Sequence, residues 1–245
     1  MRDSYAWHET LLWNPNLRTE ETMKSQDRVV SLYGKYKKIR IRLDYTYHDV
    51  YTKERILFQD SIIDSMLEET ASTQETETRK CGQPPPWIVF TAGAMGAGKT
   101  HTLKLLHTKG RFPLHSFTVV DPDRIRSRLP EFKMYIQVDP ERAGELTRKE
   151  AGLMAEVLVQ AALERGHKVL VDGSLRDASW YQNYFRQLRL NHPDLRIAIL
   201  HITAPRMSVL EHAAVRPLRM SESSRCSDVR SIPNLISHLL SSATS

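Results

Sequence analysis

The eight residues Gly93-Ala-Met-Gly-Ala-Gly98-Lys99-Thr100 have the types and spacing needed to bind the phosphates of a nucleotide, because they fit the pattern G-x-x-x-x-G-K-[ST] in full. Glycines let successive backbone N–H groups surround a phosphate at the start of a helix, where the helix dipole also favours an anion. Lys99 is then expected to contact the β- and γ-phosphates, and the Thr100 hydroxyl to ligate Mg²⁺. A chance Gly/Ala turn is the alternative, but an apolar, strand-like stretch precedes the loop and helix-forming residues follow it. The residues expected to contact the nucleotide are Gly93, Ala94, Met95, Gly96, Ala97, Gly98, Lys99, Thr100 and Thr102.

Two carboxylates, Asp121 and Asp123, follow the next apolar run, with Pro122 between them to restrict the backbone. Carboxylates beside a phosphate site suit a general base or a water-mediated metal contact. An Asx-turn or a helix N-cap is the alternative, since Asp is common there. On its own Asp123 fits both interpretations equally, and the phosphate loop one strand away favours the functional one.

A third apolar run ends in Asp172-Gly-Ser174-Leu-Arg176-Asp177. An acid that closes an apolar strand is typical of a residue that holds Mg²⁺ directly or through water. Ser174 offers a hydroxyl, and Arg176 can pair with a phosphate through two parallel hydrogen bonds. The alternative is a helix N-cap at Ser174 or Asp177 with a solvated Arg176. We expect Asp177 to be the cap, and Asp172 and Arg176 to face the site.

Two further segments carry polar residues, each with two possible interpretations. Thr147 and Glu150 lie in a helix predicted from Glu141 to Arg165 and can reach the sheet edge, although a solvated helix face explains them as well. The segment after Ala204-Pro205 is rich in arginine, which is typical of a lid that closes over phosphates but also of solubilising surface helices. Its arginines are Arg206, Arg216, Arg219, Arg225 and Arg230.

Alternating strands and helices must position these residues. Helices are predicted to start at Lys99, Glu141 and Asp177, and Gly110 and Gly166 stand where helix C-caps belong. This order predicts an α/β fold of the P-loop kinase type, a three-layer sandwich with a mainly parallel sheet. Ligands of such sheets bind at the carboxyl ends of the strands. The predicted strands are Trp87–Ala92, Ser116–Asp121, Lys168–Asp172 and Arg196–Thr203.

The chain is predicted to divide at a polar linker over residues 69–86. Residues 1–68 form an N-terminal extension, in which the partial alternation from Lys37 to Tyr47 indicates a strand or hairpin arm. Helical spacing of apolar residues predicts a helix from Lys53 to Glu69 that packs on the core. Residues 87–245 form the nucleotide-binding domain, with the arginine-bearing lid at about 205–233.

Composition limits the remaining function classes. The 245 residues carry a formal net charge of +6 and only two cysteines, with no signal-peptide pattern and no apolar run approaching the roughly 20 residues of a membrane helix. We therefore expect a soluble, intracellular, cytoplasmic protein without a membrane partner. The basic stretch from Lys35 to Arg42 is interpreted as a solvated strand face, so nucleic acid is not the expected partner.

Taken in order, these motifs resemble the zeta-toxin family of P-loop kinases over residues 87–233. The resemblance also covers Trp180-Tyr181 and Arg230-Ser-Ile-Pro233. Members phosphorylate a small metabolite with ATP or GTP and Mg²⁺, and the bacterial toxins act on a hydroxyl of UDP-N-acetylglucosamine. The resemblance implies a general base at Asp123 and phosphate and Mg²⁺ contacts at Lys99 and Thr100. Implied substrate contacts are Glu150, Asp172, Ser174 and Arg176, and implied lid residues are Arg216 and Arg230.

The chain departs from the family at several positions. Asp172 replaces a Glu of the bacterial toxins, Ser174 replaces the usual Thr, and residues 220–228 lack the usual Thr-Gly-Arg. The first hypothesis is a nucleotide-dependent kinase of a small-molecule hydroxyl. A nucleotide-binding regulatory module with a degenerate lid and a kinase of polynucleotide ends are the alternatives. A protein antidote and the oligomeric state are not predicted.

Overall fold

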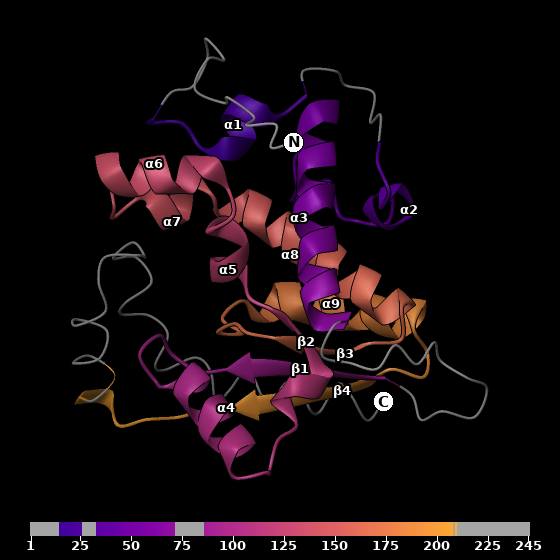
Figure 1. Ribbon diagram of the computed structural model, residues 1–245, viewed down its shortest axis with the longest axis vertical. Coiled ribbons are helices and arrows are strands. Elements are labelled where there is room, and N and C mark those ends of the chain that lie inside the picture. Colours follow the sequence, from indigo (N-terminus) through magenta and orange to yellow (C-terminus); the bar gives the residue numbers. More distant parts are fainter. Residues whose placement is uncertain (1–14, 26–32, 72–85, 208, 210–245) are drawn as a thin grey trace. The chain divides into compact units, whose positions relative to one another are not determined.

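The computed structural model describes residues 15–25, 33–71, 86–207 and 209 (Figure 1). The predicted linker beyond residue 71, and Arg216 and Arg230 of the predicted lid, lie outside these residues. The described chain forms two compact units. The first unit contains residues 15–25, 33–64 and 122–157, and the second contains residues 65–71, 86–121, 158–207 and 209.

Within the described residues, the second unit is built on one parallel sheet of four strands in the order β2-β3-β1-β4. The strands are β1 (Trp87–Ala92), β2 (Phe117–Val120), β3 (Lys168–Val171) and β4 (Arg196–His201). These runs of apolar and β-branched residues form strands because both faces of a parallel sheet are buried. Each predicted strand is confirmed, and the observed ends differ from the predicted ones by at most two residues.

Helices cover both faces of this sheet. Neighbouring residues of a strand point to opposite faces, so Val89 and Phe90 of β1 mark the two sides. Val89 packs with Leu103 of α4 (Lys99–Thr108). Phe90 packs against Phe185 of α9 (Ala178–Asn191), with ring centroids 4.8 Å apart. The second unit is therefore a three-layer α/β sandwich, as predicted.

The first unit is helical. Its longest helices, α3 (Lys53–Ala71) and α8 (Arg148–Glu164), also contribute residues to the second unit. The helix predicted from Lys53 to Glu69 is confirmed by α3. The helix predicted from Glu141 is interrupted at Thr147, where α7 ends with the Thr147 hydroxyl donating to Ala143 O at 3.0 Å. The shorter helices are α1 (Thr19–Met23), α2 (Lys37–Arg40), α5 (Pro122–Arg126), α6 (Pro130–Val138) and α7 (Ala143–Leu146).

The strand or hairpin arm predicted from Lys37 to Tyr47 is wrong. The segment instead forms α2 and the turns that follow it. Ile39 is 2% exposed and Ile41 is 66% exposed, whereas a strand would point both side chains to one face. Arg40 is buried at an ion pair with Asp60 of α3, and this contact, distant in the sequence, outweighs the local alternation.

None of the described helices is both long enough and apolar enough to cross a membrane.

Candidate functional site

The phosphate loop, residues 93–100, connects the carboxyl end of β1 to the first turn of α4 as predicted. The φ angles of Gly93, Gly96 and Gly98 are 140°, 86° and 83°, in the region that favours glycine. At Gly93 a Cβ atom would also lie 2.2 Å from the backbone oxygen of Ile202, next to β4. The backbone conformation of the loop therefore requires glycine at these positions.

Lys99 lies over this loop. Its Nζ donates hydrogen bonds to Gly93 O at 2.9 Å and Ala94 O at 3.1 Å. The loop is tightened by a bond from Ala97 N–H to Ala94 O at 3.1 Å, and α4 starts with a bond from Thr102 N–H to Gly98 O at 2.8 Å. An ammonium group and a helix N-terminus thus share one loop, which is the electrostatic arrangement that a polyphosphate needs.

Asp172 follows β3 and faces the start of α4. Its backbone N–H donates to Val120 O at 2.9 Å, which continues the pairing between β2 and β3. Its Oδ1 accepts a hydrogen bond from the Thr91 hydroxyl at 2.7 Å, and its Oδ2 lies 3.5 Å from Thr100 Oγ1. The two predicted Mg²⁺ ligands, Thr100 and Asp172, therefore lie close together, and their binding of Mg²⁺ stays a prediction.

The donor set around Asp172 fits Mg²⁺. Thr100 and Asp172 supply hard oxygen atoms, which Mg²⁺ prefers, together with those of nucleotide phosphates. The described residues contain no cluster of three or more His, Cys, Asp or Glu side chains able to hold a metal. Mg²⁺ is usually bound by one or two carboxylates together with substrate phosphates, and Asp172 supplies one carboxylate here.

The turn after Asp172 lies beside the phosphate loop, since Gly93 N–H donates to Ser174 O at 3.4 Å. Leu175 adopts a φ of 53° and is 1% exposed, so the turn places a non-glycine residue in the left-handed region. Ser174 and Arg176 are half-buried on either side of it. Their proposed contacts with substrate and phosphate stay predictions.

Asp177 is the N-cap of α9, as predicted. Its side chain accepts hydrogen bonds from Trp180 N–H at 3.1 Å and from the Ser179 hydroxyl at 2.8 Å. The bond from the Trp180 backbone is the main reason that the pKa of Asp177 lies below its ordinary value. This residue serves the helix rather than the reaction.

Asp123 belongs to the first unit and lies in the first turn of α5, not at a cap. Its side chain is 48% exposed and accepts a hydrogen bond from Arg126 Nη1 at 2.6 Å. The carboxylate is thus accessible and is paired with Arg126 of its own helix. Its role as a general base stays a prediction.

The structure places Glu150 in the interior of the first unit. It is completely buried, so the solvated helix face is wrong for Glu150, and the same holds for Thr147. The Glu150 carboxylate accepts hydrogen bonds from Arg55 Nε at 2.6 Å, Arg55 Nη2 at 2.9 Å and Gln59 Nε2 at 2.8 Å. Both of its oxygens are thus engaged inside the first unit, and its contact with substrate stays a prediction.

Arg55 is the centre of this buried cluster, and it also donates to the Glu131 carboxylate from Nη1 at 2.8 Å and from Nη2 at 3.1 Å. Burial alone would raise the pKa of Glu150, but the charge and hydrogen bonds of Arg55 lower it below its ordinary value. Burial also acts against the charged form of Arg55, yet the two carboxylates raise its pKa. Arg55 belongs to no motif of the sequence, and a cation within the apolar spacing of α3 is its only signal.

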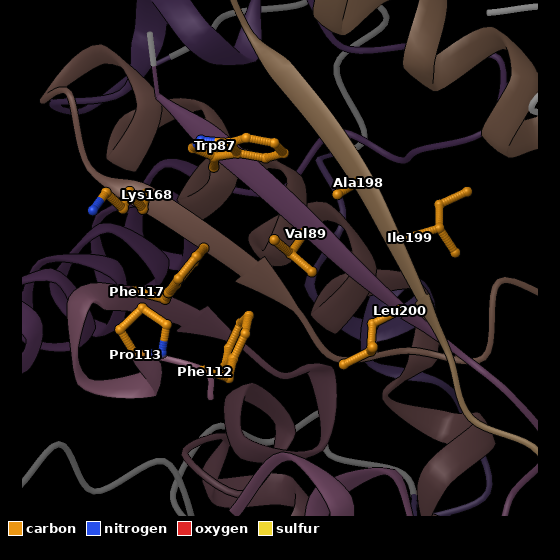
Figure 2. Close-up of a pocket in the computed structure, with 9 residues that line it drawn as sticks. All are labelled: Trp87, Val89, Phe112, Pro113, Phe117, Lys168, Ala198, Ile199 and Leu200. Atoms are coloured by element: carbon orange, nitrogen blue, oxygen red, sulfur yellow. The ribbon is translucent and has the colours of Figure 1, made fainter. Parts of the chain in front are cut away.

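A cavity of about 400 Å³ lies on the α4 face of the sheet in the second unit. Figure 2 shows Lys168 and Leu200 at opposite ends of it. Phe112 and Phe117 stack against each other, with ring centroids 5.0 Å apart. The lining is apolar apart from Lys168 and includes no residue of the phosphate loop, so this cavity is separate from the candidate site. Its lining residues are Trp87, Val89, Phe112, Pro113, Phe117, Lys168, Ala198, Ile199 and Leu200.

The fold is similar to solved structures that share little sequence with it. A structure from the PezAT chromosomal toxin–antitoxin system of Streptococcus pneumoniae matches with a TM-score of 0.56 and 21% identity, over 75% of this chain and 74% of that one. The AvrRxo1-ORF1:-ORF2 complex in its native form matches with a TM-score of 0.56 and 14% identity, over 92% of this chain and 69% of that one. The same complex with ATP matches with a TM-score of 0.55 and 13% identity, over 92% and 68%.

A search of curated proteins gives no match. The family model described as Zeta toxin matches residues 68–242, which is more than half of the chain and includes the phosphate loop, Asp123 and the Asp172 turn. The chain therefore belongs to the zeta toxin family, a family of ATP-dependent kinases with a phosphate loop.

Proposed function

We propose that this protein transfers the γ-phosphoryl group of ATP or GTP to a hydroxyl group of a small metabolite, such as the nucleotide sugar UDP-N-acetylglucosamine. The observation that carries the proposal is the phosphate loop with Lys99 above it and Asp172 Oδ2 3.5 Å from Thr100 Oγ1. Family membership supports it, as does the ATP complex of the similar AvrRxo1-ORF1:-ORF2 structure.

The nucleotide is held by groups of the second unit. Backbone N–H groups of the loop and the positive end of α4 bind the phosphates, and Lys99 moves its ammonium from the loop carbonyls to the β- and γ-phosphates. Thr100 and Asp172 are the residues that would hold Mg²⁺. When bound, Mg²⁺ neutralises charge on the phosphate oxygens. Arg176 would add a bidentate contact to phosphate, and Ser174 a hydroxyl contact to the acceptor.

Asp123 is the proposed general base. Its carboxylate accepts the proton of the acceptor hydroxyl while the hydroxyl oxygen forms a bond to the γ-phosphorus. The bond from the γ-phosphorus to the bridging oxygen breaks, and the nucleoside diphosphate leaves. Arg216 and Arg230, outside the described residues, are proposed lid arginines that stabilise the charge of the transition state. This assignment rests on the motif order shared with the family.

Replacing Asp123 by Asn tests the proposed chemistry. We expect transfer of labelled phosphate to a panel of nucleotide sugars, sugars and nucleosides to fall by roughly 10²–10⁴-fold, because an amide cannot accept the proton. Binding of ATP, measured by calorimetry, should stay as in the wild type. The control is Glu54→Gln, which removes an exposed carboxylate at the start of α3.

Equal loss of binding and transfer in Asp123→Asn would contradict the assigned role. A wild-type protein that binds ATP but phosphorylates no acceptor in the panel would instead favour a nucleotide-binding regulatory module. The observation that favours this second function is that residues 220–228 lack the Thr-Gly-Arg usual in the family.

A further inference from the structure

Thr91 is a buried polar residue in a strand that is otherwise apolar. Its side chain lies in β1, Trp-Ile-Val-Phe-Thr-Ala, and is 0% exposed. A hydroxyl removed from water must find hydrogen-bond partners inside the protein, because burying it without them costs free energy. Neither the sequence motifs nor the family match assigns it a role.

The partners of Thr91 are both in the turn that carries Asp172. Thr91 Oγ1 accepts a hydrogen bond from Gly173 N–H at 2.9 Å and donates one to Asp172 Oδ1 at 2.7 Å. Gly173 O, at 3.0 Å, is a second acceptor. A hydroxyl has one proton to donate, and a carboxylate is the stronger acceptor of the two. The single hydroxyl therefore contacts both the backbone and the side chain of the turn.

These side-chain hydrogen bonds take the place of backbone pairing between β1 and β3 at the end of the sheet. The pairing of β1 with β3 runs up to Phe90 and Val171, and Thr91 and Asp172 are the next residues along each chain. There the Gly173 N–H goes to a side-chain oxygen rather than to the backbone of β1. On the other side, Asp172 N–H still donates to Val120 O at 2.9 Å. The turn is thus held from β2 through the backbone and from β1 through Thr91.

As a consequence, the two carboxylate oxygens of Asp172 have different partners. Oδ1 is held by Thr91, and Oδ2 is directed toward Thr100 Oγ1 at 3.5 Å. Mg²⁺ demands near-ideal octahedral geometry, so its affinity depends on how its ligands are oriented. Residues that orient metal ligands typically contribute 10–100-fold to metal affinity.

We propose that Thr91 is a positioning residue that orients Asp172 for the Mg²⁺ accompanying the nucleotide. The proposal rests on the proposed function, because it assumes that a nucleotide and Mg²⁺ bind beside Thr100. Thr91 itself touches neither the nucleotide nor the metal. It acts through the carboxylate that it holds.

The test measures how ATP binding depends on the Mg²⁺ concentration, with no phosphate acceptor present. In Thr91→Val, which keeps the shape but removes the hydroxyl, we expect half-maximal enhancement of ATP binding to need roughly tenfold more Mg²⁺. ATP binding in EDTA should be unchanged. Thr91→Ser, which keeps the hydroxyl, should behave as the wild type, and Thr91→Ala is a second variant without the hydroxyl if Thr91→Val does not fold.

Two further variants separate positioning from general damage to the sheet. Thr118→Val removes a hydroxyl of the same sheet that is 1% exposed and bonded to His167 Nδ1 at 3.1 Å, and it should leave the Mg²⁺ requirement unchanged. In an Asp172→Ala background, Thr91→Val should have no further effect on that requirement, since its action runs through Asp172.

The outcomes are distinct. A wild-type Mg²⁺ requirement in folded Thr91→Val or Thr91→Ala would overturn the inference alone, and so would an equal shift in Thr118→Val. A wild-type protein whose ATP binding does not respond to Mg²⁺ at all would overturn both this inference and the proposed metal site.

Discussion

At the scale of the residue, contacts between neighbours in the sequence could be predicted, whereas contacts between distant residues could not. The phosphate loop and the Asp177 cap were recognisable because their chemistry depends on neighbours within a few positions of the sequence. The role of Thr91 was not, because its partners Asp172 and Gly173 lie in the turn after β3, 81 and 82 residues away in the sequence. Glu150 was misinterpreted for the same reason, since Arg55 lies 95 residues away in the sequence.

Lys99 gives the prediction that belongs to this scale. In Lys99→Met the ammonium is lost while most of the side-chain volume remains. We expect ATP affinity to fall at least tenfold, because hydrogen bonds to charged groups contribute about 1.5–3 kcal/mol each. Calorimetry checks this, with Lys104→Met as the control, since Lys104 is an exposed lysine of the same helix. Unchanged ATP affinity in Lys99→Met would show that the loop does not bind phosphate through this residue.

At the scale of the element, the strands of the sheet and the helix α3 could be predicted, and the segment from Lys37 to Tyr47 could not. Runs such as Trp87–Ala92 are apolar except for Thr91, and a strand covered on both faces explains them. The partial alternation from Lys37 to Tyr47 favours a strand locally, yet the segment forms α2, in which Arg40 is paired with Asp60 in the interior. Partners that are distant in the sequence decide between strand and helix there.

The buried cluster of Arg55, Glu131 and Glu150 yields a prediction about stability and pH. Arg55→Met leaves two buried carboxylates without their cation, so we expect the free energy of unfolding to fall by about 3–5 kcal/mol. Lys133→Met, on the exposed side of α6, is the control. Denaturant unfolding measures both, and a loss no larger in Arg55→Met than in the control would contradict the importance of the cluster.

The pH dependence should change sign between the two proteins. In the wild type the pKa of Glu150 is lowered from 4.5, so its stabilising contribution is complete above pH 4.5 and is lost as the pH falls through the lowered value. In Arg55→Met burial dominates and raises the pKa of Glu150. The variant should therefore gain stability as the pH falls toward 5, and Glu150→Gln in that background should flatten the response. A variant that is stabilised by rising pH would contradict this account.

At the scale of the whole molecule, the two compact units do not follow the division expected from the sequence. Residues 122–157, which follow β2, belong to the same unit as residues 15–64. The sequence does not directly indicate that these two segments share a unit. A change in composition marks a boundary between segments that are neighbours along the chain, and it does not show which distant segments pack together. The buried contacts of Arg55 with Glu131 and Glu150 are the physical reason, since they join the extension to α6 and α8.

A shortened chain that begins at Glu68 tests this organisation. It keeps the phosphate loop and the sheet but lacks Arg55 and Gln59, so Glu131 and Glu150 lose their partners. We expect residues 122–157 to lose protection from hydrogen exchange, while β1 and β3 keep theirs. Full protection of residues 122–157 in the shortened chain would show that the extension is not needed to fold them.

Phosphoryl transfer to a small metabolite is the activity proposed for the whole molecule. Its most direct measurement is incubation of a metabolite extract with γ-labelled ATP and the wild-type protein, followed by chromatography of the labelled products. The account predicts a new labelled metabolite with the wild type that is absent with Lys99→Met and with Asp123→Asn. No labelled product from a protein that binds ATP, or the same product from Asp123→Asn at the wild-type rate, would contradict it.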